Sequence, residues 1–536
     1  MISLTKKHRY LLSVLSGILM VISYPFSGSL TPLVFISWVP LLFLESYIAK
    51  KSYKSGKVFI HAYISFIIYN VGTTWWVWNA EASGAMLAFI LNSLLMTITF
   101  YAFHLAKKHI GEKEGYLALV FYWIAFEYFH LNWEMSWTWL TLGNSFSIVP
   151  SWVQWYSFGG ALGGSFWILL INLLFFRTVQ NVYLKKESWK IQTPIFYSIA
   201  FLIIFPIGIS LYTYYNYTEK EYPIEVIALQ PNIDPYNEKF NPASFSKQLE
   251  TLISLADSLV TDQTDLIVAP ETAFSMNFNE AEIQALDFFR YFISQKAEKL
   301  NDVPWYIGAS TYRLFSKKNS RASRIQGDGT YVEFYNTSML IDKNNDVEFI
   351  HKSKLVPGPE VVPFSEVFPF LEELSIQNGG TSGTLGIEKE PRIFELDEFK
   401  FAPVICYESI YGEWVTEQVR KGAQLICIVT NDGWWKDTPG YKQHLSFASL
   451  RAIESRRSIV RSANTGTSCF VNQRGDISQK TEWWKRDAIK GKVNLNSEIT
   501  FYTQYGNVMG RSFSFAAILL LLFTFSKKIR KKYISK

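Results

Sequence analysis

Cysteine is scarce in this chain of 536 residues, which contains only Cys406, Cys427 and Cys469. Three thiols in a chain of this length exclude the dense disulfide framework of small secreted domains. Cys427 and Cys469 lie in apolar, strand-like runs and are interpreted as core residues. Cys406 differs, because it stands at the end of an apolar run, residues 401–405, and Tyr-Glu-Ser follows it. That pattern predicts a buried strand that carries the thiol to a strand-to-helix turn.

Charge is absent from long stretches of the first part of the chain. Residues 10–44 carry none, which is enough for two membrane passes of about 20 residues each. The break lies at the turn-like Ser27-Gly-Ser-Leu-Thr-Pro32. A signal peptide is the alternative for the first run, but the second run follows at once and favours an uncleaved helical hairpin. Further apolar runs lie at about 58–78, 84–106, 116–131, 152–176, 194–215 and 512–526. We expect eight spans, seven before a large polar segment and one after it.

Lysine and arginine are absent from every second loop between these runs, namely 27–32, 79–83 and 132–151. The alternate loops and the C-terminus are basic, as in Lys50, Lys51, Lys54 and Lys57. The positive-inside rule then predicts that both termini are cytoplasmic and that residues 216–507 lie on the outer face. The net charge of +6 resides mainly in these short segments, so it indicates topology and no nucleic-acid partner. Glu127 is almost alone as an ionisable residue within a predicted span, and we expect it to make a structural hydrogen bond, with a role in binding an acceptor substrate as the alternative.

The polar segment has the alternation of an α/β domain. Strands are predicted at 224–230, up to Glu271, at 305–309, at 401–405, at 425–429, near 459–471 and at 488–495. Helices are predicted at 245–260, 280–299, after Cys406 and at 441–457, and a hairpin at 330–352. The Gly-, Ser- and Thr-rich residues 371–397 predict a mobile loop and candidate lid. Strands alternating with helices and hairpins indicate a two-sheet sandwich flanked by helices.

Three stretches of this segment each place a reactive side chain beside a predicted strand. They are Leu266-Ile-Val-Ala-Pro-Glu271, His351-Lys352 followed by Leu355-Val-Pro357, and Phe401-Ala-Pro-Val-Ile-Cys406. An ordinary thiol has a pKa of about 8.5 and is mostly protonated at neutral pH, so a nucleophilic Cys406 needs a base and a cation. Glu271 would take the proton if burial raises its pKa toward the working pH. Lys352 would favour the thiolate and stabilise an oxyanion.

Three further residues are predicted to support this chemistry. The backbone N–H of Tyr407 directly follows the nucleophile and is a natural second oxyanion donor. Glu360 would hold Lys352 in place or act as a second carboxylate, and Glu408 follows shortly after Cys406. The product would be a thioester acyl-enzyme that a second nucleophile attacks. His444 lacks the company of other metal-ligand residues, so we expect no metal site and no cofactor.

In this order, Glu271, Lys352 and Cys406 resemble the Glu-Lys-Cys triad of the nitrilase (carbon–nitrogen hydrolase) superfamily, over roughly residues 222–496. The segment Asn431-Asp-Gly-Trp-Trp435 is similar to an Asn-Asp-x-Trp segment near the active site of that family. The resemblance implies an αββα sandwich, which the strand pattern alone does not specify. The expected domains are a seven-helix transmembrane domain (1–215), an extracytoplasmic nitrilase-like catalytic domain (216–507), and a transmembrane helix with a basic cytoplasmic tail (508–536).

The membrane spans narrow the resemblance to the bacterial apolipoprotein N-acyltransferase family. The matching motifs are Val268-Ala-Pro-Glu271, Lys352 with Leu355-Val-Pro357 and Glu360, and Ile405-Cys-Tyr-Glu408. The chain departs from the family at Pro359, where glycine is more usual. The resemblance implies a monomeric enzyme of the bacterial inner membrane that is acylated on Cys406 by a phospholipid. The acyl chain would then pass to the N-terminal, diacylglyceryl-modified cysteine of an apolipoprotein.

Two alternatives remain at this point. A membrane-tethered amidase would use the same triad with water as the acyl acceptor. A transporter or scaffold with a degenerate outer domain is disfavoured, because Glu271, Lys352 and Cys406 are all present.

Overall fold

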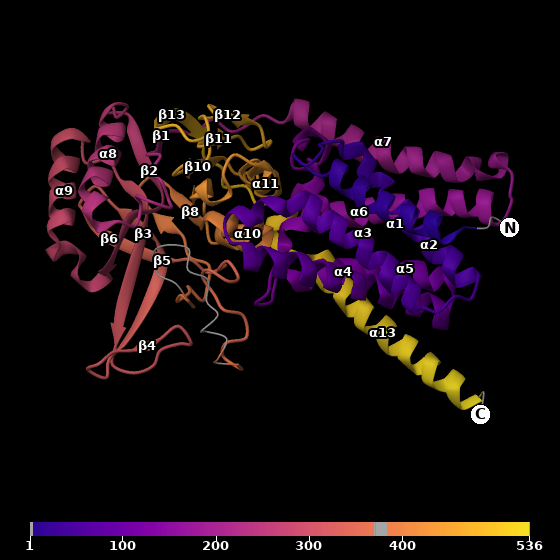
Figure 1. The fold of residues 1–536 in the computed structure, drawn as a ribbon. Coiled ribbons are helices and arrows are strands. Elements are labelled where there is room, and N and C mark those ends of the chain that lie inside the picture. Colours follow the sequence, from indigo (N-terminus) through magenta and orange to yellow (C-terminus); the bar gives the residue numbers. More distant parts are fainter. Residues whose placement is uncertain (1–3, 369, 371–382, 535–536) are drawn as a thin grey trace. The chain divides into compact units, whose positions relative to one another are not determined.

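The computed structural model describes residues 4–368, 370 and 383–534, and the chain divides into two compact units. One unit contains the residues up to Trp78, Ala82–Asn216 and the residues from Asn507 onward. The other contains Asn79–Glu81 and Tyr217–Gly506. In Figure 1 the first unit runs from indigo to magenta and ends in the yellow helix α13.

The first unit is helical, and among the described residues it has one long helix at each predicted apolar run. These helices are α1 Lys6–Ser23, α2 Val39–Lys50, α3 Gly56–Thr74, α4 Ala82–Ile110, α5 Glu112–His130, α6 Tyr156–Val179, α7 Thr193–Asn216 and α13 Val508–Ile534. The last helix belongs to this bundle, because the Phe513 ring lies 4.9 Å from that of Phe121 in α5 and 5.8 Å from that of Phe166 in α6. Residues from the two ends of the chain therefore build one helical unit.

Five helical segments of the described chain are long and apolar enough to cross a membrane. They are Thr31–Lys50, Ala82–Ile110, Tyr156–Leu184, Trp189–Asn216 and Val508–Arg530. The other three long helices are shorter and carry more polar residues. Lys6, Lys7 and Arg9 open α1, and α5 starts with Glu112. The structure therefore has the apolar helices of a membrane domain, and the count of eight spans stays a prediction.

Ionisable side chains are buried inside this unit at more than one place. Glu127 of α5 accepts hydrogen bonds from Trp123 Nε1 at 3.0 Å and from the Leu142 N–H at 2.9 Å, as expected of a structural hydrogen-bond acceptor. The expectation that it stands almost alone is wrong. Glu45 of α2 is also buried, and it pairs with His104 Nδ1 at 2.6 Å and with Lys107 of α4. Buried charges persist when they are paired, and a single sequence does not reveal the partner helix.

The second unit contains two mixed β-sheets among its described residues. The strand order of the first is β13-β1-β2-β3-β5-β4, with β6 also paired to β5, and that of the second is β12-β11-β10-β9-β8-β7. The first sheet comprises β1 Pro223–Gln230, β2 Thr264–Asn279, β3 Trp305–Phe315, β4 Arg324–Ile325, β5 Tyr331–Ile341, β6 Val347–His351 and β13 Asp487–Asn494. The second comprises β7 Phe394–Glu395, β8 Lys400–Ile405, β9 Leu425–Thr430, β10 Ile459–Ala463, β11 Cys469–Val471 and β12 Ile477–Ser478.

Strand β1 shows why the two sheets stack. Its side chains alternate between faces, as in any strand. Ile227 and Leu229 pack among residues of the helices α8 Phe245–Asp257 and α9 Asp287–Lys299. Val226 and Ala228 pack against apolar residues of the second sheet, such as Phe401. Both faces of the first sheet are therefore buried.

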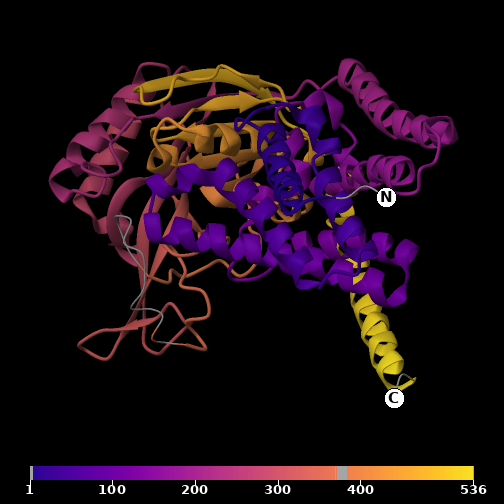
Figure 2. The same cartoon turned by 45° about the vertical axis from the view of Figure 1, so that its right-hand side comes forward.

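The second sheet is covered in the same way on its far face. Val404 of β8 and Ile426 of β9 pack with side chains of α10 Gly412–Arg420 and α11 Pro439–Ser455. Figures 1 and 2 show the resulting layers within this unit, with α8 and α9 beyond one sheet and α10 and α11 beyond the other. This is the αββα sandwich that the resemblance implied. Of the predicted loop 371–397, residues 371–382 lie outside the described residues, and the remainder contains β7.

Candidate active site

Cys406 lies at the carboxyl end of β8, as predicted from its apolar run. The strand pairs in parallel with β9 and ends at Ile405, and Cys406 begins the 3-10 helix η11 Cys406–Ile410. The residue is half-buried, and its φ of 50° lies in the left-handed region that non-glycine residues rarely adopt. Cys427 and Cys469 are fully buried in β9 and β11, so their interpretation as core residues is confirmed.

Glu271 lies inside β2, and the expectation that the strand ends there is wrong. The strand continues to Asn279, but its register against β3 shifts between Ala269 and Phe274. Thr272 within this bulge has a φ of 48°. Bulges re-aim side chains and are frequent beside active sites. Glu271 is buried, and its Oε1 accepts a hydrogen bond from Asn336 Nδ2 at 2.8 Å.

Lys352 directly follows β6, and its ammonium lies between two carboxylates. Its Nζ is 2.8 Å from Glu360 Oε1 and 3.3 Å from Glu271 Oε1, and its side chain is only 1% exposed. The other oxygen of Glu360 accepts the Val356 N–H at 2.8 Å. Glu360 therefore pairs with Lys352, which is the contact that the hypothesis of a supporting role for Glu360 requires. The presence of Pro359 does not displace it.

The resting charges of these groups follow from burial and from their neighbours. Burial opposes the charge of Glu271, but Lys352, Asn336 and Lys239 outweigh it and hold the pKa of Glu271 below its usual value. The condition set for Glu271 as a base, a pKa raised toward the working pH by burial, is therefore not met in the resting site. Burial also opposes the charge of Lys352, but Glu360 and Glu271 raise its pKa. Burial and then the charge of Glu271 raise the pKa of the Cys406 thiol, although Lys352 opposes them. The resting site thus pairs a neutral thiol with an ionised carboxylate.

Glu408 connects the loop of Lys352 to the turn of Cys406. Its Oε1 accepts the N–H groups of Ser353 at 2.7 Å and Lys354 at 3.2 Å, and its Oε2 accepts the N–H of Ile405 at 2.9 Å. The side chain is buried, which raises its pKa despite these backbone donors. Three N–H groups from two separate loops therefore converge on one carboxyl group.

Two site residues were missed by sequence reasoning. Asn336 of β5 links Glu271 and Glu360, because its Nδ2 lies 3.0 Å from Glu360 Oε1 as well. Lys239, in the segment after β1, is buried and donates from Nζ to the main-chain oxygen of Glu271 at 2.7 Å. Burial lowers its pKa to about 8, although the charges of Glu271 and Cys406 act in the opposite direction. A polar residue inside an apolar strand was the available signal for Asn336, and Lys239 had none.

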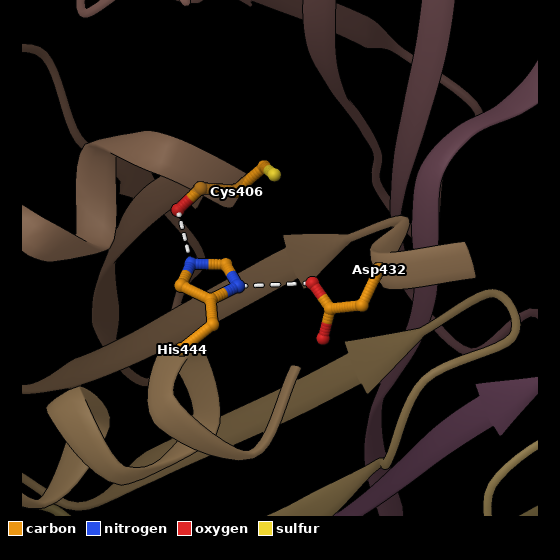
Figure 3. A group of neighbouring side chains, drawn as sticks. All are labelled: Cys406, Asp432 and His444. Atoms are coloured by element: carbon orange, nitrogen blue, oxygen red, sulfur yellow. Dashed lines mark hydrogen bonds and ion pairs between the residues drawn. The ribbon is translucent and has the colours of Figure 1, made fainter. Parts of the chain in front are cut away.

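Cys406 also belongs to a second cluster, which it forms with Asp432 and His444 (Figure 3). The ligand atoms of the three residues lie within 4.8 Å of one another, so the expectation that His444 lacks such company is wrong. His444 Nδ1 is 2.9 Å from Asp432 Oδ1, and Arg461 Nη2 is 2.7 Å from Asp432 Oδ2. A guanidinium bound to the carboxylate disfavours a cation there. We therefore interpret the cluster as a hydrogen-bonded network.

Comparison with known proteins places both units in context. A carbon–nitrogen hydrolase family model matches residues 226–501, and the model of the apolipoprotein N-acyltransferase N-terminal domain matches residues 16–174. An apolipoprotein N-acyltransferase of Chlorobaculum tepidum is 32% identical over 511 residues, which cover 93% of each chain. One from Geobacter metallireducens is 25% identical over 538 residues, covering 97% of this chain and 96% of the relative.

Proposed function

The chain belongs to the apolipoprotein N-acyltransferase family, and from this we propose how its residues transfer an acyl chain. The donor is a membrane phospholipid that gives its sn-1 acyl chain. The acceptor is the α-amino group of the N-terminal diacylglyceryl-cysteine of an apolipoprotein. Cys406 is the nucleophile, Glu271 the base, and Lys352 the cation beside them.

Acylation begins when the thiol gives its proton to Glu271 as Sγ attacks the ester carbonyl. Glu271 is able to accept this proton because Lys352 and Asn336 keep it ionised at rest. The negative charge that develops on the carbonyl oxygen is stabilised by Lys352 and by the N–H of Tyr407. The tetrahedral intermediate then collapses and the C–O bond of the ester breaks. The departing lysophospholipid oxygen takes the proton from Glu271, which leaves a thioester on Cys406.

Transfer to the acceptor uses the same residues, with Cys406 now as the leaving group. Glu271 takes a proton from the attacking amine, the C–S bond breaks, and the proton passes to the departing Cys406 sulfur. The products are a lysophospholipid and an amide on the lipoprotein, and the enzyme returns to its starting protonation state. Glu360 and Glu408 support both steps by holding Lys352 and the two loops in place.

One observation carries this assignment. Lys352 lies within 3.3 Å of Glu271, which is 81 residues away in the chain, and within 2.8 Å of Glu360. The charges of Glu271 and Lys352 both act on the Cys406 thiol. The apolar helices of the first unit give a reason for lipid substrates, because both the donor and the acceptor reside in a bilayer.

We also propose the location of the enzyme. Residues 216–507 form the catalytic domain on the outer, periplasmic face of the inner membrane. Residues 1–215 and 508–536 supply the membrane helices, and both termini lie in the cytoplasm. The basic loops support this orientation. We further propose that the protein acts as a monomer.

The test is intact-protein mass spectrometry after incubation with phospholipid vesicles alone. We expect the wild type to gain one acyl mass that hydroxylamine removes. Cys406→Ala should gain none, and Cys427→Ala, which changes a buried cysteine of β9, should still be acylated. A diacylated lipopeptide should then discharge the adduct and become N-acylated.

Two outcomes would contradict the proposal. An adduct on Cys406→Ala would place the acyl group on another residue. Release of free fatty acid by the wild type, without transfer to the lipopeptide, would indicate a hydrolase that uses water as the acceptor.

A further inference from the structure

The carbonyl group of Cys406 is held by two buried side chains. Ser409 Oγ donates to the Cys406 oxygen at 2.8 Å, and His444 Nε2 lies 3.1 Å from the same oxygen. A carbonyl oxygen only accepts hydrogen bonds, so this contact is a hydrogen bond when Nε2 carries a proton, and Ser409 Oγ lies 2.9 Å from the same nitrogen. Figure 3 shows the Cys406 oxygen turned toward the imidazole, while the sulfur lies on the other side of the residue. Both contacts compensate a backbone conformation that is otherwise unfavourable.

The orientation of the His444 imidazole is fixed by Asp432, which is in turn bound by Arg461. His444 Nδ1 lies 2.9 Å from Asp432 Oδ1, which also accepts a hydrogen bond from Thr430 Oγ1 at 2.8 Å. Arg461 binds the other oxygen of Asp432 at 2.7 Å. His444 and Arg461 are 1% exposed, and Asp432 is fully buried. Burial opposes the charge of Asp432, but Arg461 and His444 hold its pKa well below the usual range. The network therefore lies inside the protein and lacks the exposure that a substrate-binding group needs.

The orientation of the Cys406 carbonyl determines the direction of the next N–H group. The peptide bond is planar, and every described peptide bond is trans. In a trans peptide the C=O and the following N–H point in opposite directions. When His444 and Ser409 hold the Cys406 oxygen on one side, the Tyr407 N–H points to the other side. The direction of the predicted oxyanion donor is thus set by side chains that do not touch the substrate.

We propose that His444 is a positioning residue that orients the Cys406–Tyr407 peptide and so directs the Tyr407 N–H at the oxyanion. Asp432 and Arg461 hold the imidazole in place, and Ser409 shares the carbonyl contact. This inference rests on the proposed function, because the oxyanion that the Tyr407 N–H would stabilise forms in the proposed acylation step. Ser409 is not a second nucleophile in this arrangement, since it is 2% exposed and its proton is directed at the Cys406 oxygen.

The test compares acylation with alkylation of the same thiol in membrane-reconstituted full-length enzyme. Alkylation by iodoacetamide forms no oxyanion, so a residue that only orients the Tyr407 N–H should not affect it. We expect His444→Leu to lower the rate of thioester formation from phospholipid by about 10²-fold, as for loss of one oxyanion donor. Its alkylation rate should stay within about twofold of wild type. The KM for phospholipid should also be unchanged, because the loss concerns the intermediate.

Two variants sharpen the result. His444→Gln restores an N–H donor near the position of Nε2 and should recover part of the acylation rate. Lys442→Gln changes a more exposed residue of the same helix and should acylate at the wild-type rate. Acylation of His444→Leu at the wild-type rate would overturn the inference, and so would a parallel loss of alkylation. Failure of the wild type to form a thioester would instead overturn the proposed function, so the two failures are distinguishable.

Discussion

At the level of single residues, Glu271 and Lys352 are charged in the resting site and the thiol of Cys406 is neutral. The pKa of Glu271 is lowered and that of Cys406 is raised, so the proton transfer between them is unfavourable until the substrate arrives. A neutral thiol is a poor nucleophile, which limits side reactions of the resting enzyme. Reaction therefore depends on cations that stabilise the charge as it develops. Lys352 is one, and Lys239 is placed to be another.

Lys239 should give the reaction a pH dependence on the alkaline side. Its pKa of about 8 lies below the ordinary value of about 10.4, so the ammonium loses its proton as the pH rises through 8. Its positive charge favours negative charge on Cys406 as the thiol loses its proton, so we expect the rate of thioester formation to fall through that pH. Lys239→Met should lower the rate of thioester formation at pH 7 by at least about tenfold. It should also abolish the alkaline limb of the pH–rate profile, which is the fall in rate through pH 8. The measurement is the acylation rate between pH 6 and 9.5.

The control for this prediction is Lys247→Met, which removes an exposed lysine of α8. It should keep both the rate and the alkaline limb of the wild type. The effect of Lys239 on stability has the opposite sign. Between pH 8 and about 10.4, Lys239 binds more protons in the unfolded chain than in the folded one. The free energy of unfolding therefore increases with pH in that window. An unchanged alkaline limb in Lys239→Met would assign it to another group.

At the scale of elements, the periodic strands and helices were predictable and the irregular segments were not. The strands ending at Gln230 and Ile405 follow from apolar runs, and the two-sheet sandwich follows from strands that alternate with helices and hairpins. The Pro270-Glu271 pair predicted the end of strand β2. The strand continues past Glu271 because a β-bulge accommodates these two residues. Glu271 lies inside β2, and Lys352 and Cys406 directly follow β6 and β8. They were predicted together because their order along the chain resembles that of the nitrilase triad. Lys239 and His444 act on main-chain oxygens 32 and 38 residues away, a spacing that leaves no local pattern.

Glu408 makes a prediction about two elements at once, because it connects the segment after β6 to the end of β8. Glu408→Ala leaves three N–H groups without their acceptor, that of Ile405 buried and those of Ser353 and Lys354 partly buried, and the loss at a buried N–H costs about 1–3 kcal/mol. We expect a lower unfolding temperature and a thioester rate reduced by at least about tenfold, since Lys352 and Cys406 lose their common support. Thermal denaturation and the mass-spectrometric assay measure the two effects on the same preparation.

Glu408→Gln refines this test. A glutamine keeps one acceptor oxygen but turns an NH₂ group toward backbone donors, so it should rescue little. Glu417→Gln is the matched control, because this residue lies on the surface of α10 in a pair with Arg420 and should change stability by less than about 1 kcal/mol. Wild-type stability in both Glu408 variants would show that other contacts connect the loops.

At the scale of the whole molecule, the helical unit exposes apolar residues where a soluble protein would not. Only 11% of the most apolar part of Trp189–Asn216 and 17% of that of Val508–Arg530 is buried within the protein. Exposed side chains of α7 include Phe201, Ile204 and Phe205, and those of α13 include Leu522 and Phe525. Apolar surfaces of this extent require an apolar environment. The lipid bilayer supplies it, and the positions of the basic loops then predict the orientation of the chain.

That orientation is testable with single cysteines placed at exposed lysines. In a Cys406→Ala background the two remaining cysteines are buried, so an introduced thiol is the reactive one. Lys51→Cys probes the basic loop after α2, and Lys318→Cys probes the catalytic unit after β3. The positive-inside rule predicts that a membrane-impermeant maleimide labels Lys318→Cys in intact spheroplasts and labels Lys51→Cys only after the membrane is permeabilised. Labelling of Lys51→Cys in intact spheroplasts would invert the topology and place residues 216–507 in the cytoplasm, away from lipoproteins that have been exported.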